Sequence, residues 1–177
     1  MASVAILVNG LPGSGKTTLS ATLAGVLGCP LLATDPIKEA LADLAGPMIA
    51  PEALGTIAMD TVWSMAAEVD AGVVVDSFWH RPRDLELARA GVSRAGSPRT
   101  LEVWCDVYPD VALQRVVDRL AAAGRHPAHG TVESTRASWG EWTEAAAPLG
   151  EWPVLRVDTS TPVDVDDLVM KISEQFV

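Results

Sequence analysis

Five short runs of apolar residues punctuate the chain, and most of them are nearly continuous rather than alternating. They are Val4–Val8, Pro30–Ala33, Val73–Val75, Leu101–Cys105 and Val154–Val157. Continuous apolar runs of this length are typical of parallel strands that are buried on both faces of a sheet. The pattern therefore predicts five strands.

Segments with apolar residues at helical spacing separate these runs. We expect seven helices. The first follows the glycine-rich segment 10–17 and ends at Gly28, the second runs from Asp35-Pro36 to about Ala45, the third runs from about Pro51 to Ala71, and the fourth begins near Pro82. The fifth runs from Pro109 to Gly124, the sixth covers Thr131–Ala146, and the last follows Thr161-Pro162. Strands that alternate with helices predict an α/β fold, a parallel sheet with helices on both faces. No linker or repeat interrupts the pattern, so we expect one domain over residues 1–177.

Ligands bind beyond the carboxyl ends of the strands in such sheets, and the segment after the first run carries the clearest motif. Gly10-Leu11-Pro12-Gly13-Ser14-Gly15-Lys16-Thr17 fits G-x-x-x-x-G-K-[ST] in full, between a predicted strand and a predicted helix. Glycines let backbone N–H groups turn toward phosphate oxygens, Lys16 supplies a charge for the β- and γ-phosphates, and Thr17 offers a hydroxyl to Mg²⁺. With the neighbouring Thr18, this segment is the expected nucleotide cradle.

The rest of the chain narrows the class of nucleotide-binding protein. A GTPase would need an Asn-Lys-x-Asp type motif to read its base, but the single asparagine, Asn9, precedes the cradle. A large mechanical ATPase needs a longer chain. A compact phosphotransferase fits best.

Two acids follow neighbouring predicted strands. Asp35 comes after the second strand, where its carboxylate can take the proton of an acceptor hydroxyl; the alternative is a helix N-cap before Pro36. Asp76 ends the third strand as in a Walker B motif, where it holds Mg²⁺, faces the acceptor, or is simply a surface acid. Both are therefore candidate site residues, Asp35 as catalytic base.

Other candidates for the acceptor site lie close by. The loop after Asp76 carries Trp79 and Arg83, and Arg83 can either anchor the acceptor or pair with Asp84 or Glu86. Lys38 is the only basic residue between Pro36 and Gly72, and the first arginine is Arg81. Because this region contains no arginine, it favours an acceptor that carries no phosphate on the side that the region contacts.

The apolar residues of the same region allow two interpretations. They are Met48, Ile49, Leu54, Met59, Trp63 and Met65, and Trp139 and Trp142 share the ambiguity. Apolar residues on helices usually pack in the core. Alternatively, some of them line an apolar acceptor pocket.

A basic segment follows the helix that begins at Pro109. Arg119 lies near the end of that helix, and Gly124-Arg125-His126-Pro127-Ala128-His129-Gly130 places cations between glycines. We expect a lid over about residues 124–147, with Arg119 and Arg125 stabilising the charge on the moving phosphoryl group. The alternative is a solvated basic loop. His126 and His129 lack further ligands for zinc.

Composition limits the partners. The chain has 177 residues, a formal net charge of −10 and two cysteines, Cys29 and Cys105. The acidic balance argues against a nucleic-acid-binding surface, and no apolar run is long enough for a membrane span. We expect a cytoplasmic protein with reduced thiols, no membrane contact and an oligomeric state that the sequence does not reveal.

These features together resemble the small P-loop kinases, in particular the kinase-like ATPases that include chloramphenicol phosphotransferase, zeta toxin and polynucleotide kinase. The resemblance rests on Gly10–Thr17, Asp35, Asp76-Ser77-Phe78 with Arg83, and the segment from Arg119 to Pro127. It implies a P-loop NTPase three-layer fold with the strand order 2-3-1-4-5, ATP with Mg²⁺ as cofactors, and Asp35 as base. It also implies that Asp158 and Thr159, after the last strand, contact the adenine.

The functional expectation is an ATP-dependent phosphotransferase that acts on a hydroxyl of a small, non-phosphorylated molecule such as a sugar, nucleoside or antibiotic. The acceptor site is expected to comprise Asp35, Lys38, Asp76, Trp79 and Arg83. Two alternatives remain open: a polynucleotide 5′-hydroxyl kinase, which needs a basic groove, and an ATP-binding regulatory protein without transfer activity.

Overall fold

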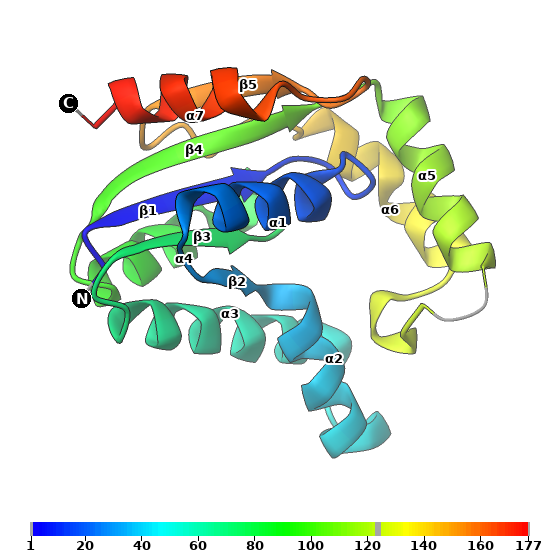
Figure 1. Ribbon diagram of the computed structural model, residues 1–177. Coiled ribbons are helices and arrows are strands. Elements are labelled where there is room, and N and C mark those ends of the chain that lie inside the picture. The colour runs from blue at the N-terminus through cyan, green and yellow to red at the C-terminus, as the bar shows by residue number, and fades with distance from the viewer. Residues whose placement is uncertain (1, 123–124, 177) are drawn as a thin grey trace.

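The computed structural model describes residues 2–122 and 125–176, which form a single parallel sheet covered by helices (Figure 1). The strands are β1 (Val4–Asn9), β2 (Leu31–Ala33), β3 (Gly72–Asp76), β4 (Arg99–Asp106) and β5 (Val154–Asp158). They lie in the order β2-β3-β1-β4-β5, and every pairing is parallel. The predicted strands and their order are confirmed.

Helices cover both faces of the sheet and cross the ends of its strands. They are α1 (Lys16–Leu27), α2 (Thr34–Ala45), α3 (Pro51–Ala67), α4 (Arg81–Arg94), α5 (Pro109–Ala121), α6 (Val132–Glu144) and α7 (Val165–Glu174), with short 3₁₀ turns η1 (Gly46–Met48) and η2 (Pro127–His129). In Figure 1, α1 and α7 lie on one face and α3 and α4 on the other, while α5, α6 and η2 stand at the ends to which the strand arrows point.

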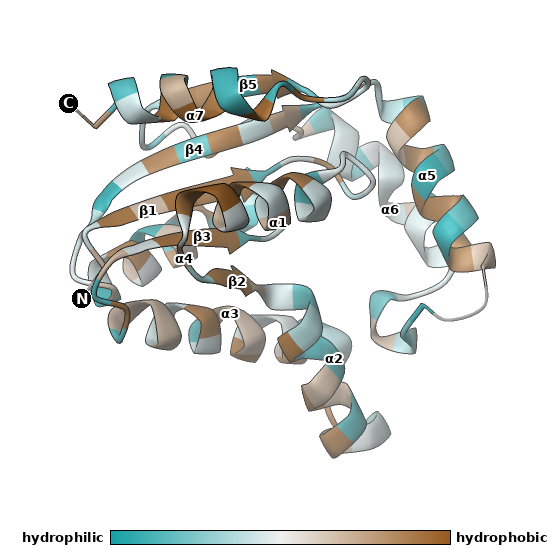
Figure 2. Ribbon diagram, viewed as in Figure 1, coloured by the Kyte–Doolittle hydropathy of each residue, from teal (hydrophilic) through white to brown (hydrophobic). Residues whose placement is uncertain are grey.

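Neighbouring side chains of β1 point to opposite faces of the sheet, and this explains why the residues from Val4 to Val8 are all apolar. Ile6 and Val8 pack with α1 and α7, whereas Ala5 and Leu7 pack with α3 and α4. Both faces of this part of the strand are buried, so each of these positions needs an apolar side chain. Figure 2 shows the result as strands that are mostly brown beneath helices of mixed colour.

Several helix ends differ from the prediction. Helix α3 stops at Ala67 rather than Ala71, because Glu68 and Val69 donate backbone hydrogen bonds three residues back and tighten the last turn. Helix α5 ends at Ala121. Gly124, where the sequence predicts both the helix end and the start of the lid, lies outside the described residues.

Two helix starts have side-chain caps that fit their sequences. Thr131 accepts a hydrogen bond from the Ser134 N–H at the start of α6, and Asp164 accepts one from the Asp167 N–H at the start of α7. In the described part of the chain, none of the helices is long and apolar enough to cross a membrane.

Candidate active site

The glycine-rich segment links β1 to α1 and takes a backbone conformation that favours glycine, as Gly13 and Gly15 illustrate. Gly13 has φ +83°, and a Cβ there would lie 2.2 Å from the Ala112 carbonyl oxygen of α5. Gly15 has φ +89° and forms the N-cap of α1 without a side-chain hydrogen bond. The first N–H groups of α1 therefore stay available at the positive end of the helix, which is the arrangement that binds phosphate.

Lys16 begins α1 and turns back across this loop. Its Nζ donates a hydrogen bond to the Leu11 carbonyl oxygen at 3.1 Å. Burial lowers the pKa of Lys16, and the carboxylates of Asp76 and Asp35 act in the opposite direction. The ammonium group thus lies in a poorly solvated position, where a phosphate charge would interact with it strongly.

Asp76 ends β3 beside this lysine. The backbone register places it next to Val8 on one side and Ala33 on the other, and the residue is only 4% exposed. Burial raises the pKa of Asp76, while Lys16 and a hydrogen bond from the Thr17 hydroxyl lower it. A hydroxyl and a carboxylate held together in this way are suitable oxygen ligands for Mg²⁺. The surface-acid alternative for Asp76 is wrong.

Asp35 lies in the first turn of α2, at the same edge of the sheet. It is not the N-cap as the sequence suggested, because the extended conformation that precedes the helix belongs to Ala33. Its side chain is 60% exposed, and one of its oxygens lies 3.8 Å from Arg125 and 3.9 Å from His129. Both distances exceed a hydrogen bond, so the carboxylate can still accept one from a ligand.

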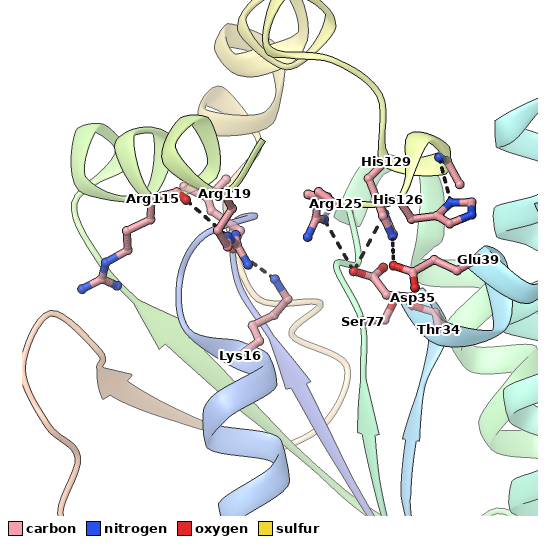
Figure 3. Close-up of polar contacts among 12 residues, drawn as sticks. Lys16, Thr34, Asp35, Glu39, Ser77, Arg115, Arg119, Arg125, His126 and His129 are labelled. Carbon is pink, nitrogen blue, oxygen red and sulfur yellow. Dashed lines mark hydrogen bonds and ion pairs between the residues drawn. The ribbon is translucent and has the colours of Figure 1, made fainter. Parts of the chain in front are cut away.

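Two arginines of α5 stand above the cradle, and they differ in their contacts (Figure 3). Burial and the nearby Arg125 lower the pKa of Arg119, and Asp35 opposes them. Arg119 donates from Nε to the Arg115 carbonyl oxygen at 3.2 Å. Arg115 donates to the carbonyl oxygens of Gly13 and Thr159 at 3.4 Å, so it ties the cradle to the loop after β5.

A cavity of about 380 Å³ lies between α1 and the loop after β5. Thr18 and Thr159 line it together with Gly15. Asp158 does not line this cavity; it accepts hydrogen bonds from the Ser160 N–H and hydroxyl and borders a separate hollow that contains Tyr108. Of the two residues expected at the adenine, Thr159 is the one placed beside the cradle.

Lys38 of α2 and Arg83 of α4 are the basic residues that the sequence predicts at the acceptor. Burial lowers the pKa of Lys38; the carboxylates of Asp35 and Glu52 oppose this shift, and the charges of Arg83 and Arg125 add to it, so Lys38 lies within electrostatic reach of these groups. Arg83 also forms a close pair with Asp84, with hydrogen bonds of 2.6 and 2.8 Å. The pairing interpretation of Arg83 is therefore confirmed, and its side chain remains 63% exposed.

Trp79 is a correction to the predicted site. The residue is 1% exposed and packs in the core with α3 and α4. Its backbone N–H donates to the Asn9 side chain at 3.1 Å, which draws the loop back over the sheet and directs the indole inward. A ligand at the sheet edge does not reach this ring.

The apolar residues that allowed two interpretations divide between core and surface. Leu54 and Trp63 are buried, whereas Met48 and Met65 are largely exposed. Trp142 makes edge contacts with both Phe78 and Trp139. The Lys16 ammonium lies 5.9 Å from the Phe78 ring centre, so this aromatic cluster borders the cradle.

Sequence reasoning missed the contacts between α2 and the lid. His129 Nε2 lies 2.7 Å from a Glu39 carboxylate oxygen, and His126 Nε2 lies 3.0 Å from Asp43. It also missed the buried pair in which the Asn9 amide donates to Glu102 at 2.9 Å. The spacing of four between the acids of α2 was the available signal for the first group.

Comparison with known proteins places this geometry in a family. A family model described as an AAA domain matches residues 6–145. A structure from Chloroflexus aurantiacus J-10-fl, provisionally called a kinase, is 26% identical with a TM-score of 0.83 and 99% coverage of both chains. No curated protein matches the sequence.

More distant structures share the fold alone. A gluconokinase from Sinorhizobium meliloti 1021 is 17% identical with a TM-score of 0.63, covering 98% of this chain and 91% of its own. A shikimate kinase from Bacteroides thetaiotaomicron is 21% identical with a TM-score of 0.54, and 98% of each chain is covered. The chain has the P-loop kinase fold and belongs to the AAA domain family.

Proposed function

We propose that this protein is an ATP-dependent kinase that transfers the γ-phosphoryl group to a hydroxyl of a small molecule, such as a sugar, a nucleoside or an antibiotic. The observation that carries the proposal is the position of Asp35. Its exposed carboxylate lies within electrostatic reach of both Lys16 and Arg119, with Arg125 of the lid segment at 3.8 Å. A base beside the phosphate cradle and under cationic cover is what phosphoryl transfer to a hydroxyl needs.

The residues divide the reaction between them. The acceptor hydroxyl oxygen attacks the γ-phosphorus, the bond from that phosphorus to the β,γ-bridging oxygen breaks, and ADP leaves with the electron pair. Asp35 takes the hydroxyl proton. Lys16, Arg119 and Arg125 stabilise the charge that builds on the transferred group, which is the main contribution a protein makes to this reaction.

Thr17 and Asp76 would hold the magnesium ion that accompanies ATP. The hydrogen bond between them already brings two oxygen ligands together beside Lys16. When bound, the ion neutralises charge on the β- and γ-phosphates. Thr18 and Thr159, which line the cavity next to the cradle, are the residues that we assign to the nucleoside.

The acceptor side supports a compact acceptor without a phosphate. Lys38 is the only cation that α2 and α3 contribute near Asp35, and Arg83 is already paired with Asp84. Phe78 and Trp142 add an apolar border to the region. An acceptor with several hydroxyls and an apolar face fits these surroundings.

An acceptor screen tests the proposal. Purified protein, MgATP and panels of sugars, nucleosides and aminocyclitol or phenolic antibiotics are followed by ADP release, and a hit is confirmed by transfer of label from γ-³²P ATP. At least one small hydroxyl compound is expected to raise ADP release well above the rate with water alone. Uniform failure across the panels, with MgATP bound normally, would contradict the proposed activity.

A further inference from the structure

Helix α2 carries three acids on one face, and three basic residues of the lid segment lie opposite them. Asp35, Glu39 and Asp43 are spaced by four residues, so their side chains line up along the helix. Arg125 approaches Asp35 at 3.8 Å, His129 approaches Glu39 at 2.7 Å, and His126 approaches Asp43 at 3.0 Å. Figure 3 shows Arg125 and His129 pointing toward Asp35 and Glu39 across the space between α2 and η2. We call the three acids and the three basic residues the α2–lid clasp.

His129 holds the central place in the clasp. Its side chain is only 8% exposed, whereas those of Asp35 and Glu39 are 60% and 38% exposed. Nε2 contacts Glu39, and Nδ1 of the same ring lies 3.9 Å from Asp35. One imidazole therefore faces two carboxylates of α2 through its two nitrogens, and one of those carboxylates is the proposed base.

His126 differs from His129 in a way that makes it a useful comparison. Its Nδ1 accepts a hydrogen bond from the Ala128 backbone N–H at 3.1 Å, which leaves Nε2 to donate to Asp43. Asp43 lies two helical turns beyond Asp35. His126 thus contributes to the clasp without facing the base.

We infer that His129 is a positioning residue: it fixes the lid to α2 through Glu39 and holds the Asp35 carboxylate in the direction of the acceptor through Nδ1. This inference rests on the proposed function, because it gives Asp35 a catalytic role. An exposed aspartate has two freely rotating torsions, and the ring of His129 that lies beside it restricts them. Docking of the lid then also brings Arg125 and the aligned base to the same place.

Two substitutions separate the contacts of His129. In His129→Gln the amide nitrogen stands where Nε2 stood and can still donate to Glu39, but nothing replaces Nδ1. His129→Ala removes both contacts, and Glu39→Gln weakens the clasp while leaving the imidazole in place. Glu68→Gln, an exposed acid at the end of α3, serves as the matched charge control.

Hydrogen exchange of the nucleotide-free protein measures the clasp without any need for an acceptor. The backbone N–H groups of His129 and Gly130 donate within η2, so they report on its docking. Exchange of the peptide spanning these residues should become several-fold faster in His129→Ala and Glu39→Gln and stay near wild type in His129→Gln and Glu68→Gln. Unchanged exchange in His129→Ala would overturn the clasp.

Kinetics with an acceptor from the screen measures the positioning. Both His129 variants should lose between about 10- and 100-fold in kcat, the cost of misplacing a reacting group, with the KM for ATP unchanged. In an Asp35→Asn background, His129→Gln should have no further effect on kcat. A wild-type kcat in His129→Gln would overturn the positioning role. If no acceptor is found, the proposed function fails, and the exchange experiment alone decides the clasp.

Discussion

The donor side and the acceptor side of this site are built in different ways. Around the phosphate cradle, the backbone carries the geometry: Gly13 is pressed against α5, Gly15 caps α1, and Lys16 donates a hydrogen bond to its own loop. Around Asp35, side chains from α2, α4 and the lid segment carry it. A cradle fixed by backbone conformation binds a constant ligand, whereas side chains on separate elements can vary with the acceptor.

The largest effect should come from the donor side. Lys16→Met removes the ammonium group that we assign to the γ-phosphate, and we expect phosphoryl transfer to fall by about 1,000-fold or more. Acceptor-dependent ADP release measures it. The control is Lys171→Met, because Lys171 pairs with Asp167 on the distant helix α7 and its loss should leave the rate unchanged. A modest loss in Lys16→Met would mean that the cradle does not act through this charge.

Arg119→Ala should have the next largest effect, since Arg119 lies between the two sides. Its guanidinium lies within electrostatic reach of both Arg125 and Asp35. Removing one such cation from a developing phosphoryl charge should lower kcat by roughly 100-fold and change the KM of the acceptor little. Steady-state kinetics measures kcat and KM. The control variant is Arg136→Ala, which removes an arginine of α6. A change confined to KM would assign Arg119 to binding instead.

The sequence predicts the position of the cradle residues better than it predicts the contacts around Asp35. The cradle, Lys16, Thr17 and Asp76 lie next to one another in the sequence or at strand ends, so periodicity and motif spacing predict where the fold places them. Trp79 was misplaced because its direction depends on a hydrogen bond to Asn9, which is distant in the sequence. The His129–Glu39 contact joins residues 90 positions apart, and no local pattern encodes such a pairing.

A pair of glycine substitutions compares the two sides through stability. Gly13→Ala puts a methyl group 2.2 Å from the Ala112 carbonyl oxygen at a positive φ, which should cost about 2 kcal/mol or more of unfolding free energy. Gly140→Ala lies within α6, and its new Cβ meets open space. At this position the higher helix propensity of alanine should raise the free energy of unfolding by about 0.5–1 kcal/mol. Urea unfolding measures the free energy of unfolding of both variants. Equal changes in the two variants would contradict the claim that the backbone is more tightly constrained at Gly13 than at Gly140.

The smallest effect should come from Met48, which lies in the short turn η1 after α2. Met48 is 86% exposed, so Met48→Ala should change the unfolding free energy by less than about 0.5 kcal/mol. If the residue also lies outside the acceptor site, the acceptor KM stays at its wild-type value. A several-fold rise in that KM would instead extend the acceptor site to the end of α2.

The most direct test of the central claim separates nucleotide binding from transfer in one variant. Asp35→Asn keeps the size of the side chain and removes its ability to take a proton. Calorimetry should give wild-type MgATP affinity, because the cradle is untouched, while single-turnover transfer to the acceptor should fall by about 10²- to 10⁴-fold, the usual contribution of a general base. Transfer at the wild-type rate with normal MgATP affinity would contradict the assignment of Asp35 as the base.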